Sequence, residues 1–158
     1  MMNSFKPLQY LPTIFIALML SFYASGSAAV GGNYSSSANL EPVLEMIENG
    51  QFDAAIDFLH TELDYDPDNA DILTLLGFSY RKSRNFEDAM TYYEWAIKSE
   101  PEHRGANEYL GELYLETNQI DKAVEQLNKL ESLCSVGCRE YGVLKDAIDN
   151  FQKTAGAS

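Results

Sequence analysis

The chain has 158 residues, of which 46% are hydrophobic, so it has the length and the apolar content for one compact domain. It carries 24 acidic and 11 basic residues, which gives a formal net charge of -13 at pH 7. Nucleic acid and anionic membrane surfaces would repel such a chain, so its charge favours neutral, apolar or basic protein segments as partners.

The N-terminal residues have the pattern of a secretory signal peptide. Lys6 is followed by an apolar stretch, Leu11–Tyr23, and small residues at Ser27 and Ala29 then form a cleavage site that would leave Val30 as the new N-terminus. The alternative is an uncleaved membrane anchor, but the apolar stretch is shorter than the roughly 20 residues of a spanning helix. We therefore predict that the protein is periplasmic or secreted.

Residues of similar type recur at an interval of 34 in the rest of the chain. The matching sets are Phe52, Phe86 and Ile120; Ala55, Ala89 and Ala123; Leu59, Tyr93 and Leu127; and Leu76-Gly77 with Leu110-Gly111. Several coincident intervals of this length indicate an internal structural repeat.

The central repeat unit predicts two helices joined by a tight turn. Ala70–Lys82 carries apolar side chains at helical spacing, and Phe86–Ser99 carries a second stripe of the same kind. Gly77 and Ala89 are small enough to let the two helices approach closely, and Tyr93 is expected to fill the space beside them.

These residues resemble the tetratricopeptide repeat family. The matching motifs are Leu73-x-x-Leu76-Gly77-x-x-Tyr80, Ala89-x-x-x-Tyr93, Ala96 and Pro101 in the middle unit, and Leu110-Gly111-x-x-Tyr114 and Ala123-x-x-x-Leu127 in the next. The sequence departs from the family pattern where a tryptophan is common, because Leu73 and Asn107 stand there. The resemblance implies an all-α fold, a right-handed superhelical stack of three helix–turn–helix repeats with a C-terminal capping helix.

The expected organisation of the chain follows from the repeat. It comprises a signal peptide (1–29), a flexible linker (30–38), a tetratricopeptide domain (39–153, with repeats at about 39–69, 70–103 and 104–137 and a capping helix at 139–152) and a tail (154–158). The capping helix has a polar outer face, which a stack of repeats needs at its end.

The two cysteines, Cys134 and Cys138, lie in the segment CSVGC between the third repeat and the capping helix. Cysteines four apart across a helix end can reach the Cα separation of roughly 5.5–6 Å that a disulfide needs, and an exported protein is normally oxidised. We predict a structural disulfide and no metal. A thiol redox couple and a metal site are alternatives, although redox motifs usually have two intervening residues and neither His60 nor His103 is close in sequence.

The cysteine pair, followed by Glu140-Tyr141-x-x-Leu144-Lys145, also resembles a group of small exported tetratricopeptide proteins of alphaproteobacteria. That resemblance implies a periplasmic location.

In the tetratricopeptide family, the first helix of each repeat lines a concave groove that binds peptides or protein surfaces. The exposed faces of these helices predict the following groove residues: Asp71, Thr74, Phe78, Arg81, Lys82, Glu108, Glu112 and Glu116. Phe78 would serve as an apolar anchor, and the three glutamates would suit a basic or amphipathic segment of another envelope protein. A merely solvated acidic face is the alternative. The basic cluster Arg81-Lys82-Ser83-Arg84 would either pair with those glutamates or contact an acidic partner.

The motifs of common enzyme classes are not found in the sequence, including a phosphate-binding glycine loop, a nucleophile elbow and a His-x-x-x-His zinc helix. We therefore predict a non-enzymatic adaptor without catalytic residues or cofactors. The alternative function is a self-associating structural protein, in which an open first repeat stacks against another copy through Leu40, Leu44 and Ile47.

Overall fold

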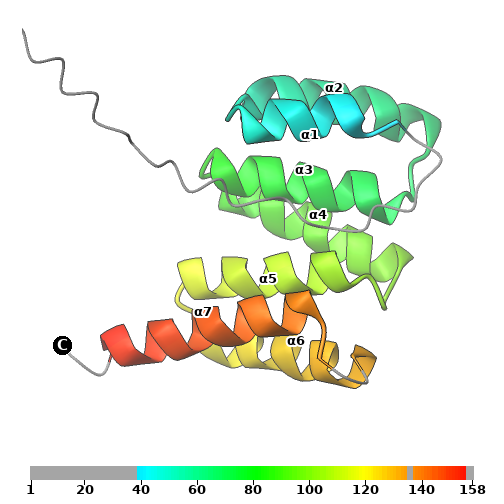
Figure 1. The fold of residues 1–158 in the computed structure, drawn as a ribbon. Helices are drawn as coiled ribbons and strands as arrows, with labels where there is room; N and C mark the ends of the chain where they lie inside the picture. The colour runs from blue at the N-terminus through cyan, green and yellow to red at the C-terminus, as the bar shows by residue number, and fades with distance from the viewer. Residues whose placement is uncertain (1–38, 135–136, 156–158) are drawn as a thin grey trace, which may run out of the picture.

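The computed structural model describes residues 39–134 and 137–155, and within these ranges every regular element is a helix (Figure 1). The helices are α1 (Glu41–Glu48), α2 (Phe52–Tyr65), α3 (Ala70–Lys82), α4 (Phe86–Ser99), α5 (Arg104–Glu116), α6 (Ile120–Leu133) and α7 (Arg139–Ala155). They pack as three hairpins, α1–α2, α3–α4 and α5–α6, and α7 lies against α5 and α6. The predicted all-α stack of three hairpins with a closing helix is confirmed.

The helix bounds agree closely with the periodicity of the sequence. Both α3 and α4 begin and end at the expected residues, whereas α7 extends beyond its predicted end at Gln152. Among the described helices, none combines the length and the hydropathy that crossing a membrane requires. The predicted signal peptide and linker lie outside the described residues.

The turn inside each hairpin has one recurring backbone conformation. Gly50, Arg84 and Asn118, which are 34 residues apart, have positive φ angles of 71°, 66° and 59°. In each turn the next residue donates its backbone N–H to the carbonyl five residues earlier, at 2.7 to 2.9 Å. This arrangement satisfies the last carbonyls of the first helix and reverses the chain.

The connections between hairpins follow a second recurring pattern. Asp66, Glu100 and Cys134, again 34 apart, end their helices with φ angles of -138°, -133° and -113°. The first two precede a proline, which disfavours the helical conformation for the residue before it. Asn69 and His103 then cap α3 and α5 by accepting a backbone N–H, at 3.1 and 3.0 Å.

Glycines allow two close helix contacts. A Cβ atom at Gly77 would lie 2.5 Å from Cδ1 of Tyr93, whose side chain is fully buried on α4. A Cβ atom at Gly111 would likewise lie 2.5 Å from Cδ2 of Leu144 on α7. These distances are far below van der Waals contact, so a larger residue at either position fits only if the facing side chain or its helix moves. The close crossing predicted at Gly77 is confirmed.

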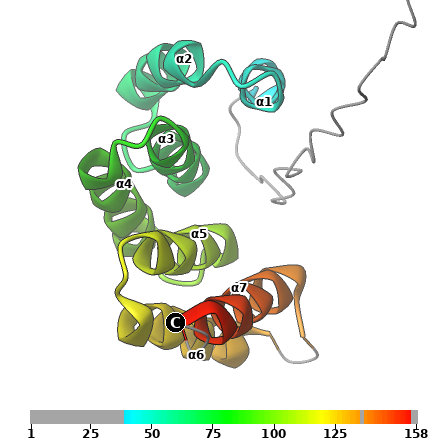
Figure 2. The ribbon, with the colours of Figure 1, turned by 90° about the vertical axis from the view of Figure 1, so that its left-hand side faces the viewer.

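The C-terminal end of the stack is covered by α7 (Figure 2). Leu144 and Ile148 of this helix are buried against the preceding hairpin. On its outer side, Lys145 and Asp149 form an ion pair with 2.6 Å between Nζ and Oδ2. The helix therefore has the apolar inner face and polar outer face that the end of a repeat stack requires.

The N-terminal end is formed by α1, which has eight residues and no side-chain cap at its N-terminus. Leu40 and Ile47 are each only 5% exposed, and Leu44 is half-buried. The expectation that these residues form an open apolar surface is wrong, because Leu40 and Ile47 belong to the hydrophobic core and Leu44 packs against it.

Replacing Gly77 with alanine should lower the free energy of unfolding by about 1–3 kcal/mol, the usual effect of overpacking a core. The new methyl group would overlap the buried ring of Tyr93. Gly142→Ala in α7 is the matched control, because no atom lies within 4 Å of a Cβ there and alanine favours helix by up to about 1 kcal/mol. Urea unfolding followed by circular dichroism measures both variants. Equal effects would contradict the packing role of Gly77.

Candidate functional site

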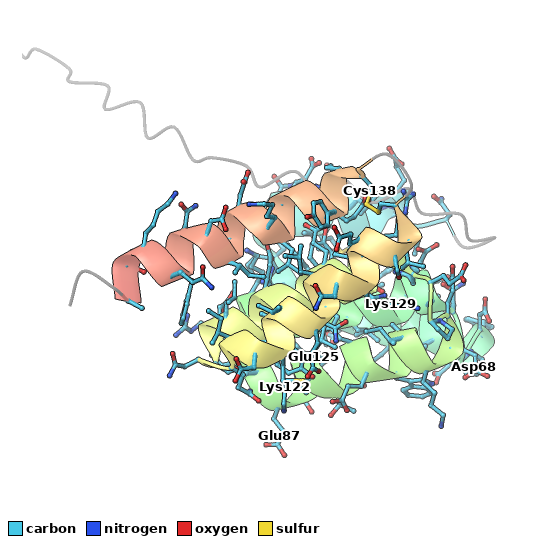
Figure 3. The ribbon with its side chains drawn as sticks, turned by 90° about the horizontal axis from the view of Figure 1, so that it is seen from below. Asp68, Glu87, Lys122, Glu125, Lys129 and Cys138 are labelled. Carbon is cyan, nitrogen blue, oxygen red and sulfur yellow. A yellow bond between two sulfur atoms is a disulfide. The ribbon has the colours of Figure 1, made fainter. Side chains whose placement is uncertain are left out.

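The stack is curved, with α1, α3 and α5 on its inner side and α2 and α4 on its outer side (Figure 2). A pocket of about 360 Å³ lies on the inner side, where α3, α5 and the first turns of α7 meet. Its lining residues are Phe78, Arg81 and Lys82 of α3, Glu108, Tyr109 and Glu112 of α5, and Arg139 and Val143 of α7. We refer to it as the α3–α5–α7 pocket. By contrast, the outer side carries exposed charged residues such as Glu87, Lys122 and Glu125 (Figure 3).

The contacts across the pocket share one sequence spacing. Phe78 contacts Tyr109, Arg81 contacts Glu112, and Glu108 contacts Arg139, and in each pair the second residue comes 31 positions after the first. A spacing of 31 is one repeat of 34 residues less three, which is almost one helical turn, so the second residue lies on the face of its helix that the first residue contacts. The repeat therefore brings these residues together.

The floor of the pocket is aromatic. Phe78 and Tyr109 are 4% and 5% exposed, and their ring centroids lie 5.2 Å apart in a tilted arrangement. The guanidinium carbon of Arg81 lies 5.6 Å from the centroid of Phe78 and 5.7 Å from that of Tyr109. Such a cation–aromatic arrangement is favourable and restricts the arginine to one orientation.

Arg81 also joins α3 to α5 through two carboxylates. Its Nη1 atom lies 2.6 Å from Oε2 of Glu112 and 3.2 Å from Oε1 of Glu116. The arginine side chain is only 4% exposed, so these ion pairs compensate a charge that has been removed from water. Of the two outcomes expected for the basic cluster, pairing with the glutamates is therefore confirmed for Arg81.

Glu108 is the most deeply buried carboxylate of the pocket. Its side chain is 2% exposed, and Oε2 lies 3.3 Å from Nη2 of Arg139. Burial raises the pKa of Glu108 to about 7, and the nearby carboxylates of Glu112 and Glu140 act in the same direction. The positive charges of Arg139 and Arg81 oppose this rise. The charge of Glu108, and with it the attraction to Arg139, therefore changes near neutral pH.

Five of the residues predicted for the groove line this pocket: Phe78, Arg81, Lys82, Glu108 and Glu112. The other three lie elsewhere. Oδ1 of Asp71 lies 2.9 Å from Nε2 of His103. Thr74 donates a hydrogen bond from Oγ1 to the carbonyl oxygen of Ala70 at 2.6 Å. Glu116 forms an ion pair with Arg81 but does not line the pocket.

The predicted exposure of the inner helix faces is wrong for most of these residues. The buried members are Asp71, Thr74, Phe78, Arg81 and Glu108, all 7% exposed or less. The physical reason is that neighbouring inner helices lie side by side, so their side chains fill the space between them rather than facing water. Lys82 and Glu116 are exposed, as expected.

Three lining residues were not predicted from the sequence: Tyr109, Arg139 and Val143. All three carry a signal that the 34-residue repeat alone does not show. Each comes 31 positions after a predicted groove residue: Tyr109 after Phe78, Arg139 after Glu108 and Val143 after Glu112. A search at this spacing would have identified all three residues.

A disulfide joins Cys134 and Cys138, with an S–S distance of 2.01 Å and a Cα–Cα distance of 5.5 Å. It connects the end of α6 to the start of α7, and Cys138 (labelled in Figure 3) immediately precedes Arg139 in the sequence. At the equivalent point of the earlier repeats the chain has a proline. The disulfide therefore restrains the segment that positions the α7 wall of the pocket.

The curved stack of hairpins, with a pocket on its inner side, defines a helical-repeat scaffold. Two tetratricopeptide repeat models match the sequence, one over residues 46–94 and the other over residues 75–135. Together they cover more than half of the chain, which therefore belongs to the tetratricopeptide repeat family. Membership of this family supports a role in protein–protein interaction.

Among solved structures, the fold is similar to that of the type III secretion translocator chaperone SycD of Yersinia enterocolitica. The TM-score is 0.65 at 13% sequence identity, and the match covers 77% of this chain and 88% of that chain. This likeness shows a shared helical-repeat fold. No curated protein matches the sequence.

The stability of the wild-type protein relative to Glu108→Gln should fall as the pH rises from about 4.5 to about 7. The pKa of Glu108 rises from 4.5 to about 7 on folding, so between these values the folded chain holds a proton that the unfolded chain has released. This rise in the pKa of Glu108 corresponds to a loss of about 3 kcal/mol in the free energy of unfolding between these two pH values. Urea unfolding at several pH values measures it, with Glu131→Gln on exposed α6 surface as the control. A difference that did not vary with pH would contradict the assignment.

Replacing Cys134 and Cys138 together with serine should lower the free energy of unfolding by about 2 kcal/mol, the chain-entropy value for so short a loop. Amide hydrogen exchange should accelerate in the first turns of α7 and stay unchanged in α3 and α4. Treatment of the wild-type protein with a dithiol reductant is the control and should reproduce both effects. Unchanged stability would argue against a structural disulfide and favour a redox role.

Proposed function

We propose that this protein is a non-enzymatic adaptor that binds a segment of another protein in the α3–α5–α7 pocket. The observation that carries the proposal is the pocket itself, a cavity of about 360 Å³ on the inner side of a tetratricopeptide stack. It combines a mostly buried aromatic floor with charged walls, which is the usual composition of a recognition site.

The occupant that fits this pocket is an amphipathic segment. An apolar side chain would lie on the floor formed by Phe78 and Tyr109 and against Val143 of α7. The charged residues at the wall would contact the polar face of the same segment. A purely basic segment is less well supported than the sequence suggested, because Glu108, Glu112 and Glu116 are each engaged by an arginine of the chain itself.

We further propose that the adaptor works in the cell envelope, after export and removal of residues 1–29. The support is the signal-like N-terminal pattern together with the disulfide between Cys134 and Cys138, since disulfides persist in oxidising compartments such as the periplasm. The partner would then be another envelope protein.

Photo-crosslinking in cells that make the protein tests the binding site. A benzophenone amino acid at Val143, which is half-buried in the pocket wall, should give a discrete adduct with one other protein. The same probe at Lys98, exposed on α4 away from the pocket, is the control and should not give that adduct. Mass spectrometry of the adduct identifies the partner and reports whether the chain begins at Val30.

The same experiment separates the alternatives. The same adducts from both positions, or none from Val143, would refute the pocket as a binding site. Adducts of the chain only with itself would favour the self-associating structural protein. A chain that retained residues 1–29 would refute the cleaved signal peptide while leaving the binding proposal intact.

A further inference from the structure

The charges around the α3–α5–α7 pocket are not equally compensated. Three basic and two acidic residues line it, although the whole chain is strongly acidic. Both acidic residues have a partner, because Glu112 is paired with Arg81 and Glu108 lies against Arg139. Arg81 is in turn occupied by two carboxylates and is almost fully buried. Any capacity for a further ion pair therefore rests with Lys82 and Arg139.

Lys82 has an unpaired charge at the edge of the pocket. Within the described residues, no carboxylate lies within ion-pair distance of its ammonium group. The side chain is exposed, and Nζ lies 5.1 Å from the ring centroid of Phe78. An aromatic face attracts an ammonium group weakly when water has access to it, so a carboxylate could still bind the lysine.

Arg139 is only partly used by the protein. Its side chain is 42% exposed, and its one carboxylate contact in the described part of the chain is with Glu108 at 3.3 Å. A guanidinium group has five N–H donors, so the contact with Glu108 and the hydrogen bond donated to the Tyr109 hydroxyl still leave donors for an incoming acceptor. Lys82 and Arg139 thus present two cations beside the apolar surface of Phe78, Tyr109 and Val143.

On the basis of the proposed function, we propose that the bound protein segment carries an acidic side chain next to its apolar anchor, and that Lys82 and Arg139 bind this carboxylate. The apolar anchor occupies the aromatic floor while the carboxylate lies between the two cations at the wall. Charge-assisted hydrogen bonds of this kind add orientation as well as affinity, because they fix which way the segment runs across α3 and α5.

The overall charge of the chain limits how acidic this segment can be. With a net charge of -13, the protein repels strongly acidic partners at a distance. A suitable segment has one acidic residue beside an apolar residue, and neutral or basic residues elsewhere. Its carboxylate is attracted by Lys82 and Arg139, and the segment as a whole is not repelled by the acidic chain. This partner chemistry agrees with the amphipathic segment that the sequence predicted and differs from the basic segment that was its alternative.

Selection of a random dodecapeptide library displayed on phage against the purified protein tests the proposal. The enriched peptides should contain aspartate or glutamate within two or three positions of a large apolar residue. Binding of the corresponding synthetic peptides, measured by fluorescence anisotropy, should weaken at least about tenfold for Lys82→Glu, as expected when a charge-assisted contact becomes a repulsion. Lys98→Glu on exposed α4 surface changes the net charge equally and should have little effect.

A third variant separates this inference from the function on which it rests. Val143→Arg should fill the pocket and abolish binding of every enriched peptide, and circular dichroism verifies that it remains folded. Suppose that peptides bind and that Val143→Arg abolishes their binding. The pocket function then stands, but the carboxylate assignment is refuted if the peptides lack an acidic residue. It is also refuted if Lys82→Glu and Lys98→Glu have equal effects. If Val143→Arg abolishes no peptide binding, the pocket function itself is refuted.

Discussion

The register between neighbouring inner helices is the constraint on which the pocket depends. A residue on one inner helix faces the residue 31 positions later, and this relation places Phe78 on Tyr109, Arg81 on Glu112 and Glu108 on Arg139. Turns whose backbone recurs every 34 residues keep the hairpins alike. Close contacts at two glycines bring helices together, because Gly77 lets α3 approach α4 and Gly111 lets α5 approach α7.

Much of the fold could be predicted from the sequence, because regular helices depend on local signals. The bounds of α3 and α4 follow from their apolar stripes, from the asparagines that cap them and from the proline beyond α4. The burial of the inner face could not be predicted in the same way, because it depends on which side chains meet across two repeats. Phe78 was recognised as unusual, but its partner Tyr109 is not itself part of the 34-residue motif. Arg139 lies outside the repeats altogether, so its contact with Glu108 follows only from the packing of α7 against α5.

Buried ion pairs give this site specificity rather than stability. Removing Arg81 and Glu108 from water carries a desolvation cost that their ion pairs only partly offset, so replacing such groups by apolar residues often leaves a protein as stable as before. What the ion pairs add is a fixed orientation. Arg81 lies over two aromatic rings while bonded to α5, so the floor and one wall of the pocket are ordered before a ligand arrives. Preorganisation of this kind reduces the entropy lost on binding.

The two ends of the stack differ in the interactions that stabilise them. No lysine or arginine occurs between Asn39 and Tyr80, a span with ten acidic residues, and no ion pair in the described part of the chain reaches α1 or α2. That end consists of an eight-residue helix and its partner, whereas the opposite end has a disulfide and several ion pairs. Because each repeat is stabilised chiefly by its neighbours, we expect thermal opening to begin at the acidic end. The pocket is lined by residues of α3, α5 and α7, so opening of the first hairpin would remove the contact between α2 and α3 but none of the lining residues.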